Sequence, residues 1–464
     1  MKTEDRTDHI TEPMAAQRSG HRRDLAAAGA GVVLVTAAAL VGRAVENADH
    51  TLYVRWPPLL ATWYPHAGPG TAAAPAVAAA VVAYGPVLAD RLRWRTLLLS
   101  CYAASLAWVF SLALIDGWGR GIAGRLTTKH EYLGVIGRFD DIGAALHSFN
   151  DHILVGPPGN WPAHVAGHPP GATLTFVLLD RIGLGGGAWA GVWCIVTGTS
   201  AAVAALICIR ALADEHTARR AAPFIVLAPV AVWAGTSADG YFTAVAAWSI
   251  TLLALAATRT VHGPEAAALG AGLLYGLVCY LSYGLTLIAV LLLAVLALTR
   301  TARPLAPCAL GALVVPVAFT LAGFNWWDAY HLLVERYYQG AGGFRPYSYW
   351  VWANLACTAI AVGPATLAGL RRTAAGAPGA VRTLRTGKPG SPQSLILFVS
   401  AAFLALLAAD LSGMSKAETE RIWQPFLLWL LPATALLPAP RRRSWLAAQA
   451  VVALVVNHLL WTGW

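Results

Sequence analysis

The stretch Thr96–Asp116, TLLLSCYAASLAWVFSLALID, is almost entirely apolar and is followed at once by a long polar segment, residues 117–187. A single helix of about 20 apolar residues is enough to cross the hydrocarbon core of a bilayer. The polar segment carries carboxylates and histidines and closes on the stiff corner Gly167-His168-Pro169-Pro170-Gly171. Together they indicate a membrane protein whose polar chemistry is gathered in one large loop, as at an active site outside the cytoplasm.

Composition supports this interpretation along the whole chain. Of the 464 residues, 57% are hydrophobic and only 12% are charged, whereas soluble domains carry about 25% charged residues. The six cysteines all lie in apolar segments without metal-ligand spacing, so we interpret them as small buried residues and assign no disulfide.

The hydrophobic pattern predicts an all-α polytopic membrane protein with about thirteen transmembrane helices. Two of these segments, 221–237 and 284–299, are short, so the number is open by one or two. Residues 169–182 are too short to cross and are expected to lie in the outer interface as an amphipathic helix. The predicted spans are 24–43, 71–89, 96–116, 188–210, 221–237, 240–258, 265–281, 284–299, 304–323, 349–370, 393–411, 422–438 and 445–463.

The formal net charge of +10 comes from basic residues clustered in short segments between the spans. The positive-inside rule places such clusters in the cytoplasm, so we expect a plasma-membrane protein with a cytoplasmic N-terminus and no nucleic-acid partner. Residues 1–23 would form a cytoplasmic tail and 24–464 a single membrane domain. Within it, 117–187 would be the extracytoplasmic loop with interfacial helices, and 372–392 a flexible cytoplasmic linker.

Three carboxylates of the large loop are candidates for acid–base chemistry: Glu131, Asp140 and Asp141. A carboxylate near an apolar interface has its pKa raised by desolvation, which suits it to take a proton from a hydroxyl. The structural alternative is that they are solvated charges that cap short helices. His147 and His152 flank Asp151, but this spacing is weaker than His-x₃-His on a helix. We therefore assign no metal, and a divalent ion remains an option.

Two further candidates sit at corners of the outer face. Pro169 and Pro170 force His168 into an extended conformation and present its imidazole rigidly, although prolines also simply begin helices. Asp239 lies at the outer end of a span, where an ionisable residue is expensive unless it is paired or functional. Its structural alternative is an N-cap of the next helix.

Cationic side chains on the same face are candidates for binding phosphate. Arg336 and Arg345 lie in the aromatic segment 324–348, whose Gly340-Ala341-Gly342-Gly343 suggests a mobile lid. Aromatic residues also gather at any membrane interface. Lys416 and Arg421 lie in a later outer segment that could instead be a charged turn with salt bridges among its own residues.

Several of these residues together resemble the C-type superfamily of polyprenyl-phosphate-sugar-dependent glycosyltransferases, most nearly the branch of protein O-mannosyltransferases and aminoarabinose transferases. The matching positions are His130-Glu131-Tyr132, His168-Pro169-Pro170, Asp239, and Glu420-Arg421-Ile422-Trp423 with Pro425 and Pro432. The resemblance implies that Glu131 acts as the base or positions the acceptor, and that Arg421 holds the leaving phosphate. His130 stands where the family usually has aspartate, so Asp140 and Asp141 stay open as alternatives for the base.

The leading prediction is therefore a glycosyltransferase that uses a polyprenyl-phosphate-sugar donor and an extracytoplasmic glycan, lipid or protein acceptor. The alternative is a multi-spanning transporter or a flippase for lipid-linked sugars, which would place its charges near the middle of the bilayer on broken helices. A structural or assembly partner also stays open.

Overall fold

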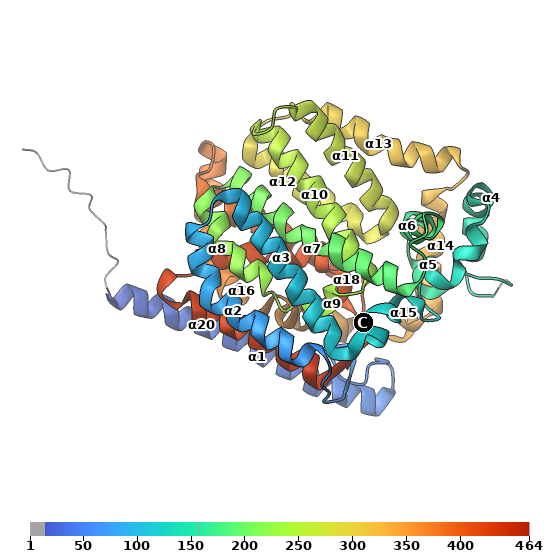
Figure 1. Ribbon diagram of the computed structural model, residues 1–464, viewed down its shortest axis with the longest axis horizontal. Coiled ribbons are helices and arrows are strands. Elements are labelled where there is room, and N and C mark those ends of the chain that lie inside the picture. Colours follow the sequence, from blue (N-terminus) through green and yellow to red (C-terminus); the bar gives the residue numbers. More distant parts are fainter. Residues whose placement is uncertain (1–13, 157, 464) are drawn as a thin grey trace, which may run out of the picture.

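The computed structural model describes residues 14–156 and 158–463, and it is built from helices with two short strands (Figure 1). Eight helices in these residues are long and apolar enough to cross a membrane, or nine if α13 (Leu305–Leu321) and α14 (Trp326–Gln339), bent by 79°, count as one broken span. The eight comprise α1 (Met14–Asp49), α2 (Gly70–Arg91), α3 (Trp94–Ala113), α7 (Gly187–Leu212), α10 (Ala238–Thr258), α11 (Pro264–Leu281), α16 (Tyr347–Thr386) and α17 (Ser391–Leu411). The all-α polytopic class is confirmed, and the number thirteen stays a prediction.

The remaining predicted spans are shorter or broken helices. Residues 221–237 fall into α8 (Glu215–Val226) and α9 (Ala231–Ala234), and 284–299 into a 3-10 turn followed by α12 (Ala289–Thr299). Residues 422–438 form the short turns α18 (Thr419–Ile422), α19 (Gln424–Leu427) and η7 (Leu431–Leu436), and α20 (Arg442–Leu459) covers most of the last predicted span.

Small residues bring the membrane helices into backbone contact. A Cβ added at Gly272 of α11 would lie 1.8 Å from the carbonyl oxygen of Cys308, and one at Gly311 of α13 would lie 2.1 Å from that of Leu269. Without a hydrophobic driving force between helices in lipid, such close packing is the main source of helix association. Glycines therefore fix how α11 and α13 sit against each other.

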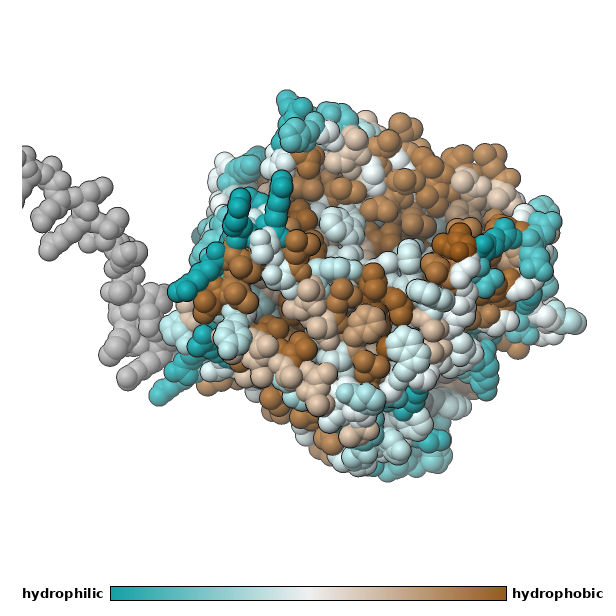
Figure 2. Space-filling view, viewed as in Figure 1, coloured by the Kyte–Doolittle hydropathy of each residue, from teal (hydrophilic) through white to brown (hydrophobic). Residues whose placement is uncertain are grey.

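The basic residues predicted to be cytoplasmic gather at one end of the helices. Arg219 donates to the carbonyls of Ala89 and Leu92, Arg442 pairs with Asp90, and Arg300 donates to the carbonyl of Leu384. In Figure 2, hydrophilic side chains line the left and upper edge of the molecule and also its right and lower right, with a broad hydrophobic surface between them. The shared position of these arginines agrees with the positive-inside pattern of the sequence.

The large loop, residues 117–187, folds into short helices around one buried tryptophan. They include η4 (Leu133–Phe139), α4 (Ile142–His147), η5 (Phe149–His152), α5 (Ala163–Gly167) and α6 (Pro170–Arg181). Trp161 is 1% exposed, its indole nitrogen donates to the carbonyl of Phe149 at 2.8 Å, and Arg138 stacks on its ring. The 12 residues of α6 are too few to cross a bilayer.

Two helices extend into segments that the sequence predicted to lie outside the spans. Residues 372–386 are not a flexible linker but continue α16, whose only non-helical residue is Gly363 with φ 75°. Alanine residues in this stretch favour a helix. Asp24 of α1 also forms ion pairs with Arg371 and Arg372. These contributions outweigh the Gly, Pro and Thr residues, which disfavour a helix. Residues 14–23 of the predicted tail belong to α1, and the rest of that tail lies outside the described residues.

The two strands tie distant parts of the chain together. β1 (Ala61–Trp63) pairs antiparallel with β2 (Leu460–Thr462), so the end of the described chain returns to the segment after α1. Arg120 and Arg125 of the large loop donate to the carbonyls of Thr462 and Gly463. The pairing therefore closes the same end of the helices from which the large loop projects.

Candidate functional site

Glu131 and His164 form an acid–imidazole pair at the base of the large loop. The side chain of Glu131 is 3% exposed, and its Oε1 lies 2.9 Å from Nδ1 of His164. The backbone supports this contact, because the N–H of His164 donates to the carbonyl of His130 at 3.0 Å. The segment just before η4 and the start of α5 are thus joined twice, and the carboxylate is held in one orientation.

His168 has the extended conformation that its prolines predicted. Its φ and ψ are −130° and 150°, Pro169 precedes α6, and Pro170 is the first residue of that helix. Nδ1 lies 2.8 Å from the carbonyl oxygen of His164 and 3.2 Å from the hydroxyl of Tyr132. Burial lowers the pKa of His168 to about 4, although Asp239 partly opposes this shift. The ring is neutral and donates from Nδ1 to the His164 carbonyl, so it positions α5 rather than supplying positive charge to a phosphate.

Asp239 is not the N-cap of α10, because Ser237 has that role. The Ser237 hydroxyl accepts from the backbone N–H of Asp239 and donates to Oδ2 of its carboxylate, both at 3.0 Å. The carboxylate is therefore turned away from the helix and toward Arg421, whose Nη1 lies 2.8 Å from Oδ2. The interpretation of Asp239 as an N-cap is therefore wrong. Asp239 instead pairs with Arg421, 182 positions later in the chain.

Arg421 joins the two halves of the site. Its side chain is 6% exposed, and its Nη2 lies 3.0 Å from Oε2 of Glu418. Burial lowers the pKa of the guanidinium, but Asp239, Glu418 and, more weakly, Glu131 outweigh burial and raise it. Arg421 is thus permanently charged. Glu131 lies near enough to Arg421 to raise its pKa. The large loop and the segment around Arg421 therefore contribute to one cluster of charges.

Glu418 was missed by the sequence analysis as a functional candidate. Burial opposes its ionisation, yet Arg421, His164 and Arg345 together lower its pKa. Its backbone lies in the left-handed region with φ 64°, as does that of Ala417 with φ 77°. Non-glycine residues in this region are strained and gather at functional sites. The only signal for Glu418 in the sequence is its spacing of three residues from Arg421. The same spacing fits the charged turn that the sequence also allowed, and the structure contains the salt bridge between Glu418 and Arg421.

Other predicted site residues lie outside this cluster. Asp140 is exposed, and Asp141 is an N-cap whose carboxylate accepts from the backbone N–H of Ala144 at 3.0 Å. Lys416 donates from Nζ to the carbonyl of Gly342 at 2.8 Å. Arg336 belongs to α14 and has a buried Nε without a hydrogen-bond partner in the described structure. The positions of Asp140 and Asp141 match the structural alternative, in which such carboxylates are solvated charges or cap short helices.

The residues do not form a metal cage. Within residues 14–156 and 158–463, no group of three His, Cys, Asp or Glu side chains has the geometry to hold an ion. The carboxylates of Glu131, Asp239 and Glu418 already face the cationic or N–H groups of His164 and Arg421. We therefore derive no chemical step through a metal.

Comparison with known proteins finds likeness only among solved structures, since no protein-family model and no curated protein matches the sequence. Archaeal oligosaccharyltransferase AglB from Archaeoglobus fulgidus, in complex with an inhibitory peptide and a dolichol-phosphate, is 14% identical with a TM-score of 0.46, over 79% of this chain and 56% of that one. An Archaeoglobus fulgidus oligosaccharyltransferase in complex with Zn and sulfate is 15% identical with a TM-score of 0.45, over 77% of this chain and 53% of that one. This chain spans about half the length of these proteins.

Proposed function

We propose that the protein is an integral-membrane glycosyltransferase that moves a sugar from a polyprenyl-phosphate donor to an acceptor hydroxyl. The observation that carries this proposal is the buried cluster at one end of the long helices, where the pair of Glu131 and His164 lies beside Arg421. A base and a phosphate-binding cation are the two groups that a single displacement at a sugar phosphate requires.

Glu131 is the proposed base. One of its oxygens lies 2.9 Å from Nδ1 of His164, which holds the carboxylate in place. We infer that the other oxygen meets the acceptor. As the acceptor oxygen forms its bond to the anomeric carbon, its proton passes to Glu131 and the bond from that carbon to the phosphate oxygen breaks. The lipid phosphate leaves with the electron pair. Asp140 and Asp141 are weaker candidates, because one is exposed and the other caps α4.

Arg421 is the proposed phosphate ligand, since its planar guanidinium can bind two phosphate oxygens at once. Both of its terminal nitrogens are occupied by carboxylates, but unequally. The side chain of Asp239 is 6% exposed, whereas that of Glu418 is 25% exposed. We infer that the donor phosphate replaces Glu418 at Nη2, while Asp239 keeps the guanidinium oriented from Nη1.

Several finer features belong to the same proposal. The site would face the outside of the plasma membrane with the N-terminus in the cytoplasm, because the basic residues gather at the other end of the helices. The donor would enter sideways from the lipid, and the acceptor would be an extracytoplasmic glycan, lipid or protein. The branch of protein O-mannosyltransferases and aminoarabinose transferases is the proposed kinship.

A transfer assay with the purified protein tests this function. A panel of radiolabelled polyprenyl-phosphate monosaccharides serves as donors, with an extract of cell-envelope glycans as acceptor. Glu131→Gln should lower the turnover about 100-fold or more, the usual contribution of a positioned base. Arg421→Gln should do the same by removing the charge that stabilises the leaving phosphate.

The matched control is the double variant Asp140→Asn/Asp141→Asn, which removes two carboxylates of the same loop and should retain transfer. If Glu131→Gln transfers as fast as the unchanged protein while the double variant is inactive, the assignment of the base is wrong. Transport of the labelled lipid across a vesicle without any transfer would favour a flippase instead.

A further inference from the structure

Two turns at the end of the helix bundle farthest from the candidate site share a sequence and a conformation. Thr258-Arg259-Thr260 ends α10, and Thr299-Arg300-Thr301 ends α12. Both arginines lie in the left-handed region, with φ 55° and 54°. That position after a helix usually holds glycine, because a side chain is strained there. Here arginine takes it twice, which places cationic side chains at the same end of two neighbouring helices.

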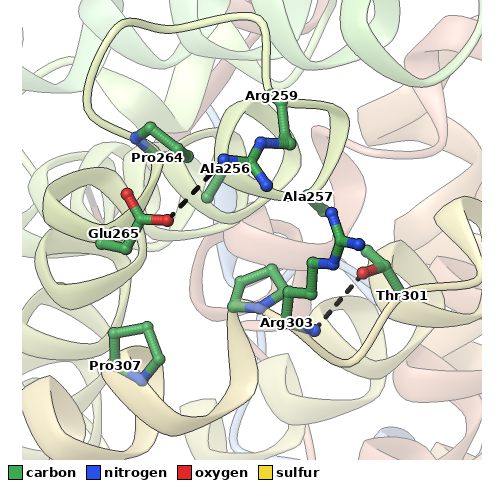
Figure 3. Close-up of a pocket in the computed structure, with 9 residues that line it drawn as sticks. Ala256, Ala257, Arg259, Pro264, Glu265, Thr301, Arg303 and Pro307 are labelled. Carbon is green, nitrogen blue, oxygen red and sulfur yellow. Dashed lines mark hydrogen bonds and ion pairs between the residues drawn. The ribbon is translucent and has the colours of Figure 1, made fainter.

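A cavity of about 200 Å³ opens between these turns (Figure 3). Arg259 of the first turn lines it, and so do Thr301 of the second turn and Arg303, two residues farther along the chain. Glu265 and three prolines also contribute to the wall. Glu265 lies 4.0 Å from Arg259, and the two side chains are 76% and 57% exposed, so this ion pair is loose. Arg303 is exposed, and its backbone N–H donates to the hydroxyl of Thr301. The pocket therefore carries a surplus of positive charge.

The pocket lies across the membrane from the candidate site. Asp239 is in the first turn of α10, and Arg259 is the residue that follows its last, Thr258. The 21 residues of α10 span about 30 Å at 1.5 Å per residue, which is the thickness of the hydrocarbon core of a bilayer. The cationic pocket and the candidate site thus lie at opposite surfaces, and the pocket lies at the surface where the basic residues gather.

Exposed apolar side chains begin directly beside the pocket. Leu305 in the first turn of α13 is 50% exposed, and Leu269 and Leu273 of α11 are each 42% exposed. Farther along α13, Leu310 and Leu313 are 63% and 58% exposed. Figure 2 shows this hydrophobic surface next to the hydrophilic upper edge. A molecule with an anionic head and long hydrocarbon chains would match both regions at once.

We propose that this pocket binds the phosphate group of an anionic phospholipid, with the acyl chains lying on the exposed faces of α11 and α13. Basic pockets between membrane helices at the cytoplasmic surface are suited to anionic head groups, and guanidinium groups bind phosphate in two-pronged fashion. The proposal does not depend on the proposed transferase activity. It identifies a lipid site distinct from any donor site, since the candidate site is one helix length away.

Lipid binding to the purified, delipidated protein tests the proposal. Native mass spectrometry with added phosphatidylglycerol should detect a retained lipid, and phosphatidylcholine should bind at least tenfold more weakly. The double variant Arg259→Ala/Arg303→Ala should lose at least tenfold in phosphatidylglycerol affinity. The double variant Arg91→Ala/Arg443→Ala removes the same charge from two other exposed arginines of the basic surface and should bind as the unchanged protein does.

Three results would overturn the proposal. The first is unchanged binding by Arg259→Ala/Arg303→Ala, and the second is an equal loss in the control, which would mean diffuse attraction. The third is binding of inorganic phosphate alone as tightly as of phosphatidylglycerol, which would leave no role for the acyl chains. Glu265→Gln removes the competing carboxylate and should strengthen phosphatidylglycerol binding, a gain that misfolding cannot imitate.

Discussion

At the scale of single residues, the most unusual group is Glu420, next to Arg421 in the chain. Its side chain is fully buried, and one oxygen accepts from the backbone N–H of Leu60 at 3.2 Å. Burial is the main cause that raises its pKa to about 7. Unlike Glu418, it has no arginine across from it in the described contacts, so ionisation near neutral pH would place an uncompensated charge beside the proposed site.

This shift predicts a pH-dependent stability. The unfolded state releases the proton near the ordinary glutamate pKa of about 4.3, and the folded state releases it near 7. Between these values the folded state holds more protons, so stability falls as pH rises, by up to about 1.4 kcal/mol per pH unit. Thermal midpoints in detergent from pH 4.5 to 7.5 should fall for the unchanged protein, and Glu420→Gln should flatten the profile. The control Glu335→Gln, at an exposed position, should leave it unchanged, whereas equal slopes in all three proteins would contradict the assignment.

At the scale of elements, the segment between α14 and α16 is fastened to the turn that carries the candidate site. Lys416 donates to the carbonyl of Gly342 within α15 (Ala341–Phe344), and Arg345 donates to the carbonyl of Lys416 at 2.7 Å. Arg345 also donates to the carbonyl of Leu52 at 2.9 Å. Cations that the sequence suggested for phosphate binding therefore hold backbone segments together.

We expect Lys416→Met to loosen this fastening. Hydrogen–deuterium exchange of residues 340–346 should rise severalfold, because a buried hydrogen bond from a charged group contributes about 1.5–3 kcal/mol. Turnover should fall while the KM for the donor stays nearly constant. A rise in KM with unchanged exchange would instead identify Lys416 as a phosphate ligand. Lys388→Met, at an exposed position beyond α16, is the matched control.

At the scale of the whole molecule, α1 is joined to the rest of the protein by a buried ionic clamp. Asp24 is fully buried, and its two oxygens lie 2.7 Å from Arg371 and Arg372 of α16. Much of the remaining surface of α1 is exposed, as at Val32, Val33 and Leu40, each at least 66%. The clamp therefore fixes the depth of α1 against α16.

Asp24→Asn should consequently destabilise the protein by about 1.5–3 kcal/mol, because the buried carboxylate makes charge-assisted hydrogen bonds to two partly exposed arginines. The thermal midpoint from size-exclusion chromatography after heating measures this loss. Asp49→Asn, at the exposed end of the same helix, should have little effect. A midpoint for Asp24→Asn equal to that of Asp49→Asn would mean that α1 is held by packing alone.

How much the sequence could predict depends on the range of the interaction. Helix class, the shortness of α6 and the conformation of His168 follow from local composition and from proline geometry. The end of α16 was misjudged because Asp24 and the alanine-rich stretch outweigh local Gly and Pro signals. His164 and Glu418 escaped notice as site residues because each owes its importance to a partner on another segment or to the folded turn.

Sequence by itself determined that this chain is an all-α polytopic membrane protein, because hydrophobic length acts locally. It also predicted basic residues at one surface and the candidate site at the other. Only the tertiary structure decided which charges meet. It places Asp239 beside Arg421, 182 positions later in the chain. It also places the ammonium group of Lys416 against a backbone carbonyl, to which it donates a hydrogen bond. Buried charges in a low-dielectric interior take whichever partner the packing of helices brings near, and no local pattern records that choice.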